Sequence, residues 1–275
     1  MNPLEFVALT PKSNCGRCGH PTCLAFAVAV TKGGTAASGC PFIDLDKLPP
    51  ELDRDRGGKG LQAVDRGQEE RDMALVAHLK SKVQTLDFSR LAHRLGAQWT
   101  QDRPDELCFS YLGRPVLLDR THLQVDGQGL VDPRDQILLY NYVAFGGGDP
   151  PRGNWVGMES LPNSISKVRT LATYCEQRLG DLFCGRPAAL ADLCRQVGGV
   201  SGPAEQSADV GMIVPVLPHV PIYLLFWDED PEDGFEARVK VLFDQEVMDF
   251  LDLESLVFAA ERLADRLIEL DTHEQ

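Results

Sequence analysis

Four cysteines lie close together near the start of the chain, within residues 9–41. Their spacing follows the pattern C-x2-C-x4-C-x16-C-P. Two cysteines three residues apart can point into one turn of chain and bind neighbouring irons, because thiolates are the usual ligands of iron–sulfur centres. The residue types and spacing therefore predict one [4Fe–4S] cluster with the ligands Cys15, Cys18, Cys23 and Cys40.

The residues around these cysteines support a cluster-binding loop. Gly16 and Gly19 allow tight turns and leave backbone N–H groups free to point at sulfur. Cys23 lies at the start of a predicted helix of small and apolar residues, 24–30, for which Thr22 is a candidate N-cap. The positive end of that helix would stabilise an anionic cluster.

Zinc binding and plain thiols are the alternatives for the four cysteines. Zinc usually takes two C-x2-C pairs, or cysteines combined with histidines at set spacing. The second pair is missing here, and His20 lies between two cysteines where it could hardly replace either. We therefore favour the iron–sulfur cluster.

Composition and charge restrict the class of protein. The 275 residues are 43% hydrophobic and 25% charged, which is ordinary for a globular protein. No apolar run reaches the roughly 18 residues of a membrane helix, and the N-terminus lacks a secretory signal. We expect a cytoplasmic protein that does not insert into membranes. Its net charge of −14 repels phosphates, so nucleic acid is not an expected partner.

The chain divides into three zones. Residues 1–45 form a cysteine- and glycine-rich cluster domain, in which basic residues slightly outnumber acidic ones. Residues 46–66 are polar, contain proline and glycine pairs, and are predicted to be a linker. Residues 67–275 carry their own apolar segments. We expect a small domain of short helices and loops followed by a larger mixed α+β domain.

The larger domain alternates between helical and strand-like patterns without a βαβ rhythm, which favours an α+β fold. Its helices are predicted at 69–86, 88–95, 133–145, 166–179, 188–197 and 253–270. Its strands are predicted at 107–112, 115–118, 212–216, 221–227 and 238–243. Asp132 is the expected cap of the third helix, and Asp244 is the expected cap of a helix after the last strand.

The cluster segment resembles the small N-terminal domain of the large subunit of the corrinoid iron–sulfur protein, part of the acetyl-CoA decarbonylase/synthase system. In that family four cysteines bind one [4Fe–4S] cluster, which passes an electron to a corrinoid cobalt. The resemblance implies the same ligand roles for the four cysteines here, but the corrinoid-binding barrel has no visible counterpart. The matching residues are Asn14, Cys15, Gly16, Cys18, Gly19, Pro21, Thr22, Cys23, 24–27, Cys40 and Pro41.

The larger domain resembles a different family. Residues from 135 to 270 are similar to a domain of unknown function from strict anaerobes that is sometimes joined to this cluster motif. The resemblance rests on residues 138–162, 219–244 and 253–263. It implies an anaerobic host and gives no activity.

Four further features have structural explanations that we favour over functional ones. Trp155 could stack on a flat cofactor, but we expect it to anchor a turn. The carboxylates of 228–233 could bind a cation, but a solvated acidic loop is commoner. His219 could ligate a metal or a corrinoid cobalt, although a hydrogen-bonded turn histidine is the usual case. The remaining cysteines are predicted to be small buried hydrophobes rather than a second cluster: Cys108, Cys175, Cys184 and Cys194.

Three functional hypotheses follow, and the sequence offers no catalytic constellation to support a particular reaction. The first is an electron-transfer or redox accessory protein, which takes electrons from a ferredoxin-like donor and passes them to a partner such as a corrinoid protein. Lys12 and Arg17 would assist docking. The second is a protein or enzyme that itself binds a corrinoid or another tetrapyrrole. The third is a cluster that acts as a structural staple or sensor.

Overall fold

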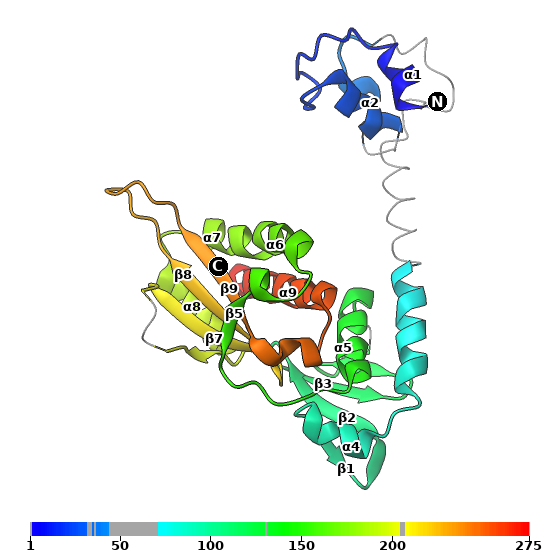
Figure 1. The fold of residues 1–275 in the computed structure, drawn as a ribbon, viewed down its shortest axis with the longest axis vertical. Helices are drawn as coiled ribbons and strands as arrows, with labels where there is room; N and C mark the ends of the chain where they lie inside the picture. The colour runs from blue at the N-terminus through cyan, green and yellow to red at the C-terminus, as the bar shows by residue number, and fades with distance from the viewer. Residues whose placement is uncertain are drawn as a thin grey trace. The chain divides into compact units, whose positions relative to one another are not determined.

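The computed structural model describes residues 2–31, 35, 37–43, 71–129, 131–203 and 207–274. The chain falls into two compact units, Met1–Ala74 and Leu75–Gln275 (Figure 1). The predicted linker, 46–66, lies outside the described residues. None of the described helices is long and apolar enough to span a bilayer.

The N-terminal unit is built from short helices, as the sequence predicts. Helix α1 (Pro3–Val7) begins with a reciprocal cap, in which Asn2 and Glu5 each accept the other's backbone N–H at 2.9 Å. Helix α2 (Cys23–Thr31) and a 3₁₀ turn, η1 (Ala37–Gly39), follow. The helices pack through Phe6 and Phe26, whose rings meet edge to face at 6.0 Å.

From Leu75 the larger unit contains the rest of a helix that spans 71–83, and α4 (Phe88–Arg94) follows. A four-stranded antiparallel sheet follows, in chain order: β1 (Gln98–Thr100), β2 (Arg103–Tyr111), β3 (Arg114–Asp119) and β4 (Leu123–Val125). The hairpin turns at Leu112–Gly113 and Asp126–Gly127 each place two residues at positive φ, the conformation that matches the twist of a two-residue hairpin. Sequence reasoning predicted the strands on either side of the first turn but missed the short strands β1 and β4.

A second antiparallel sheet of five strands has the order β5-β9-β8-β7-β6. Its strands are β5 (Trp155–Gly157), β6 (Val200–Ser201), β7 (Val210–Leu217), β8 (Val220–Trp227) and β9 (Arg238–Asp244). The central strand β8 is buried along most of its length, which explains its continuous apolar sequence. The first sheet meets this one where the N–H of Leu112 donates to the carbonyl oxygen of Val216 at 3.0 Å.

Helices cover the larger sheet and complete the α+β fold, which confirms the predicted class (Figure 1). Helix α5 (Pro133–Phe145) is capped by Asp132, as expected, and ends at Gly146, which adopts the left-handed conformation. The C-terminal helix α9 packs against α5, α6 and α8. The remaining helical elements are η4 (Met158–Ser160), α6 (Ile165–Leu171), η5 (Ala172–Glu176), α7 (Gln177–Phe183), α8 (Pro187–Gln196), η6 (Gln245–Asp249) and α9 (Leu253–Glu274).

The helix predicted over 166–179 continues to Phe183 at the end of α7. Within it, η5 is a π-helical segment that joins α6 to α7 without a break. Glu176, at the end of that segment, accepts the backbone N–H of Val241 in β9 at 2.9 Å. The wider helical turn therefore places the carboxylate of Glu176 beside a backbone donor of β9, which accounts for the position of the π-helical segment.

Asp244 is fully buried and satisfies three backbone donors. One carboxylate oxygen accepts the N–H groups of Arg152 and Gly153 at 3.0 and 2.6 Å, and the other accepts the N–H of Glu246 at 3.1 Å. The predicted cap of η6 is thus confirmed, and the same side chain also fixes the loop before β5.

We expect Asp244→Ala to lower the free energy of unfolding of the larger unit by about 3 kcal/mol, because it leaves buried N–H groups without acceptors. Urea denaturation followed by tryptophan fluorescence measures this unit alone, since Trp99, Trp155 and Trp227 are the chain's three tryptophans. Asp132→Ala is the matched control, a cap that is more exposed, and should cost about 1 kcal/mol. Equal losses in the two variants would contradict the anchoring role of Asp244.

Candidate metal centre

The loop before α2 is tightly curved. Lys12, Asn14, Gly16 and Gly19 all have φ between 49° and 78°, in the left-handed region. A Cβ atom added at Gly16 or Gly19 would meet no atom within 4 Å, so these glycines are required by backbone conformation and not by space. The repeated left-handed positions turn the chain around the segment that carries Cys15 and Cys18.

The start of helix α2 is held by two side chains. Thr22 Oγ1 accepts the N–H of Ala25 at 3.0 Å, which confirms the predicted N-cap. Asn14 Oδ1 accepts the N–H of Cys23 at 2.8 Å and so ties the curved loop to the helix. Sequence reasoning did not find this second role. The only signal in the sequence for this role is the residue type of Asn14, because asparagine tolerates positive φ and here comes immediately before the first cysteine.

The four predicted ligands all lie in the N-terminal unit, at different depths. Cys15 is exposed and Cys18 is half-buried, whereas Cys23 and Cys40 are buried. Cys18 and Cys40 belong to the same apolar cluster as Phe26. Across the described ranges, no three Cys, His, Asp or Glu side chains are grouped closely enough to hold a metal ion. The fold thus gathers the cysteines in one small unit without drawing their sulfur atoms into a ligand set.

The exposed thiol has an environment that favours its charged form. The backbone N–H of Arg17 and the hydroxyl of Ser13 hydrogen-bond to Cys15, and together they lower the pKa of its thiol. The guanidinium of Arg17 lies 5.3 Å from the ring centre of Phe42, next to the Cys40 segment. Backbone N–H donors and a nearby cation are the surroundings that thiolate ligands need.

The donor set fits an iron–sulfur cluster by its chemistry. Four thiols and no carboxylate lie on the loop and the helix end that the spacing pattern selected. His20, the remaining conceivable ligand of the segment, packs its ring 5.6 Å from that of Phe26. The residues therefore offer sulfur alone, which suits iron–sulfur clusters and is less typical of mixed Cys/His zinc sites.

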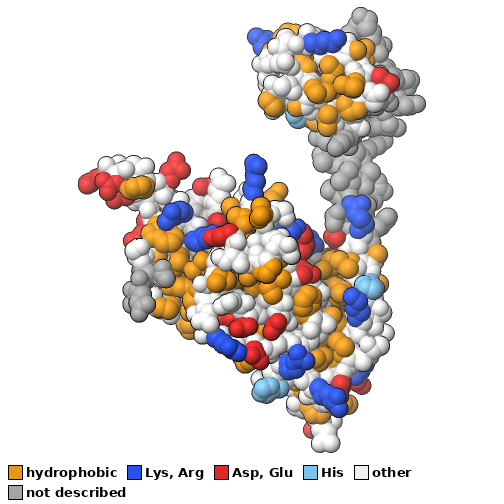
Figure 2. All heavy atoms as spheres, viewed as in Figure 1, with side chains coloured by type: hydrophobic (Ala, Val, Ile, Leu, Met, Phe, Trp, Pro, Cys, Tyr) orange, Lys and Arg blue, Asp and Glu red, His pale blue; other side chains and the backbone are white. Residues whose placement is uncertain are grey.

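Of the other candidate residues, His219 and the acidic segment have the structural roles that we favoured, whereas Trp155 has a different one. His219 Nδ1 lies 2.9 Å from the carbonyl oxygen of Arg94, and its ring packs against Phe250. Trp155 packs against Tyr223 at 5.2 Å, although it lies in strand β5 and not in a turn. The carboxylates of 228–233 form an exposed tip between β8 and β9, where Figure 2 shows acidic side chains gathered.

The remaining cysteines divide into two pairs. Cys175 and Cys194 are fully buried, and burial raises the pKa of both thiols, that of Cys194 to about 12. Their prediction as small buried hydrophobes is confirmed. The prediction is wrong for Cys108 and Cys184, which are half-buried. Cys108 lies on the outer face of the small sheet and Cys184 follows the surface end of α7, two positions whose exposure the local sequence does not reveal.

Two known protein families match separate parts of the chain. Residues 11–42 match a family described as "Putative Fe-S cluster". Residues 87–266, well over half of the chain, match the family described as "Domain of unknown function (DUF3786)". No solved structure matches the chain.

Curated relatives share only part of the chain. The large subunit of the corrinoid/iron-sulfur protein of Moorella thermoacetica is 38% identical over 74 residues, which cover 24% of this chain and 16% of that protein. Subunit gamma 1 of the acetyl-CoA decarbonylase/synthase complex of Methanosarcina thermophila is 35% identical over 78 residues, covering 24% and 17%. The gamma subunit of Methanosarcina acetivorans is 33% identical over 134 residues, covering 43% and 28%. The chain thus spans less than a third of the length of these relatives.

A cysteine loop that matches an iron–sulfur family, joined to a separate α+β unit, defines the class as an iron–sulfur protein with an appended domain. The chain belongs to the DUF3786 family. Both resemblances expected from the sequence are confirmed.

Proposed function

We propose that Cys15, Cys18, Cys23 and Cys40 bind one [4Fe–4S] cluster and that the protein transfers electrons at low potential. The observation that carries this proposal is the presence of four thiols, with no carboxylate among residues 11–42, in the segment that matches an iron–sulfur family. A bound cluster would supply one-electron chemistry. Because metal sites commonly form as the chain folds around the metal, the loop would close over the cluster on binding.

The surrounding residues have defined tasks in this proposal. The N–H of Arg17 stabilises the sulfur of Cys15, and Asn14 fixes the position of Cys23 relative to the loop. Lys12 and Arg17 leave positive charge at the exposed side of the loop, where an acidic redox partner can dock. The partner we propose as donor is ferredoxin-like.

The proposed acceptor is a corrinoid protein, because the curated relatives include a corrinoid/iron-sulfur protein and subunits of acetyl-CoA decarbonylase/synthase complexes. We propose that residues 1–45 form the cluster domain, residues 46–66 a linker and residues 67–275 the DUF3786 domain. The setting that suits such a protein is the cytoplasm of an anaerobe, where thiols stay reduced.

Anaerobic isolation tests the cluster directly. We expect about four iron and four sulfide per chain and, after dithionite reduction, the electron paramagnetic resonance signal of a reduced cubane cluster. Stoichiometric zinc, or thiols that react freely with no metal bound, would overturn the proposal. A cluster that no low-potential donor reduces reversibly would support a structural staple or sensor instead.

A second candidate is that the chain itself holds a corrinoid, which the corrinoid named in one relative favours. Addition of aquocobalamin to the anaerobic protein should then shift the visible absorption of the corrinoid with a one-to-one endpoint. An unchanged spectrum would remove this candidate and leave the electron-transfer proposal intact.

A further inference from the structure

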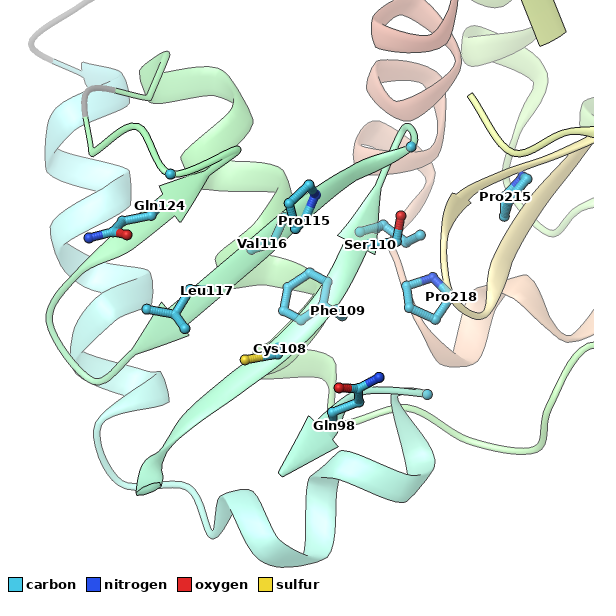
Figure 3. A pocket seen from close by; sticks show the side chains of 14 residues that line it. Gln98, Cys108, Phe109, Ser110, Pro115, Val116, Leu117, Gln124, Pro215 and Pro218 are labelled. Carbon is cyan, nitrogen blue, oxygen red and sulfur yellow. The ribbon is translucent and has the colours of Figure 1, made fainter. Parts of the chain in front are cut away.

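A groove of about 660 Å³ lies on the outer face of the small sheet β1–β4, bounded on one side by the turn between β7 and β8 (Figure 3). Its volume falls in the range of small-molecule sites, about 300–1,000 Å³. Strands β2 and β3 form the floor with alternate residues, because the intervening side chains, such as Phe109 and Val116, are buried in the core. The site belongs wholly to the DUF3786 domain.

The lining of this groove contains no charged side chain, although a quarter of the chain's residues are charged. Its surface is largely apolar and includes Pro115, Leu117, Pro215, Leu217 and Pro218. A charged ligand would lose its hydration here without gaining an ionic partner, and that loss is costly. The groove therefore favours uncharged ligands over charged ones.

Two primary amides stand at opposite ends of the groove. Gln98, Cys108, Leu117 and Gln124 are direct cross-strand neighbours, one on each strand of the sheet. At about 4.8 Å per strand, the two glutamine positions are about 14 Å apart. Each amide can donate and accept hydrogen bonds. A ligand that fits this row is flat in its apolar middle and carries neutral polar groups at both ends.

The wall of the groove is fixed before any ligand binds. Gly96 has φ of 60°, and a Cβ atom at this position would approach Pro218 Cβ to 2.8 Å and His219 Nε2 to 2.9 Å. The turn between β7 and β8 thus packs directly on the backbone that leads into β1. The hydrogen bond from the N–H of Leu112, just after β2, to the carbonyl oxygen of Val216, near the end of β7, holds the same turn against the small sheet. Such preorganisation lowers the entropic cost of binding.

We propose that this groove binds a flat, uncharged fused-ring ligand with carbonyl or amide groups at both ends. The glutamine amides hydrogen-bond the ends of the ligand, and the prolines and Leu117 contact its faces. The proposal goes beyond electron transfer, because it assigns a small-molecule site to a domain that does not contain the cluster cysteines.

Ligand-observed NMR of the full chain tests this assignment, with a set of neutral two- and three-ring heteroaromatic carbonyl compounds as probes. Riboflavin and FMN are included as a matched pair that differs only in the phosphate. We expect binding from the neutral compounds, and riboflavin to bind at least about tenfold more tightly than FMN. The absence of any bound neutral compound would overturn the proposal, as would equal binding of the two flavins.

Substitutions that introduce a charged side chain into the groove test whether the probes bind there. Gln124→Arg, on the exposed edge of the groove, should weaken binding of the neutral probes at least about tenfold. Ser110→Arg, a second exposed groove position, repeats the test if the first variant misfolds. Gln84→Arg is the matched control, because Gln84 is also an exposed glutamine but lies outside the groove, and it should leave binding unchanged.

The two groove variants also distinguish an interface between copies of the chain. If the protein is a dimer that Gln124→Arg or Ser110→Arg converts to a monomer while no probe binds, then a second copy occupies this face and the small-molecule assignment is wrong. Sedimentation velocity of the same samples measures this. Loss of the cluster in a separate variant would leave probe binding unaffected, so the two proposals can fail independently.

Discussion

Replacement of Cys15, Cys18, Cys23 or Cys40 with serine, one at a time, is expected to abolish the [4Fe–4S] signal of the anaerobically isolated protein. Iron and sulfide should fall from about four of each per chain to a small fraction of that content, because a cubane cluster needs a ligand at each of its four irons. Cys23 and Cys40 should give the more complete loss. Their thiols are buried in the N-terminal unit, where water cannot readily replace the missing ligand.

Cys108→Ser and Cys184→Ser are the matched controls, because both thiols are half-buried and lie in the other unit. We expect them to retain the full iron and sulfide content. If either control loses the cluster, or if a variant of the four proposed ligands keeps it with unchanged electron paramagnetic resonance, the ligand assignment is wrong.

The same serine variants should unfold the N-terminal unit without affecting the larger one. The core of the N-terminal unit is a small apolar cluster around Phe6, Phe26 and Ile43, separate from the extensive core of the larger unit. Domains this small usually need a metal or disulfides for stability. Limited proteolysis should therefore cut the variants within 2–43, while the tryptophan fluorescence melt of the larger unit stays unchanged. A shifted melt would indicate that the two units stabilise each other.

The parts of the fold that local sequence could predict are those with local causes. The cap at Asp132, the glycine stop at Gly146 and the helix at the C-terminus follow from residue types within a few positions of each element. The four cysteines were found because their spacing is itself the signal. The short strands β1, β4, β5 and β6 were missed, because two or three residues carry no readable alternation and pair only through tertiary contacts.

The long-range polar contacts were equally invisible to sequence reasoning. Asn14 was seen only as part of a resemblance, yet it holds the N–H of a residue nine positions away. Asp135 and Arg262 are separated by 127 positions, and each alone reads as an ordinary charged residue on a helix surface. Pairings of this kind depend on how helices pack, which residue periodicity does not determine.

Asp135→Ala is expected to destabilise the larger unit by about 3–5 kcal/mol. Asp135 is 5% exposed and accepts two hydrogen bonds from Arg262, Nε to Oδ1 at 2.7 Å and Nη2 to Oδ2 at 2.8 Å. The hydroxyl of Tyr111 donates to Oδ1 at 2.7 Å. Burial and the adjacent carboxylate raise the pKa of Tyr111 well above its usual value, so the hydroxyl remains a donor. The substitution leaves the guanidinium with Asp265 as its remaining acceptor, at 3.1 Å from Nη1, and leaves the buried hydroxyl of Tyr111 without its acceptor.

The network joins three elements, since Tyr111 ends β2, Asp135 begins α5 and Arg262 lies in α9. Its loss should therefore lower the urea midpoint of the tryptophan fluorescence transition for the whole unit and not for one edge of it. Asp192→Ala removes an exposed ion pair to Arg195 and serves as the control, with an expected cost of at most about 1 kcal/mol.

The double variant Asp135→Leu with Arg262→Met separates two contributions to the free energy of unfolding. One is the stabilisation by the ion pair, and the other is the penalty for leaving one charged partner buried without the other. Buried ion pairs lose much of their attraction to desolvation, so apolar residues of similar size often replace both partners with little loss. We expect the double variant to recover most of the stability lost in Asp135→Ala, with a remaining deficit from the unpaired hydroxyl of Tyr111 and from the lost ion pair between Arg262 and Asp265. A double variant as unstable as Asp135→Ala would show that the ion pair itself, and not the avoidance of a lone buried charge, stabilises the contact between α5 and α9.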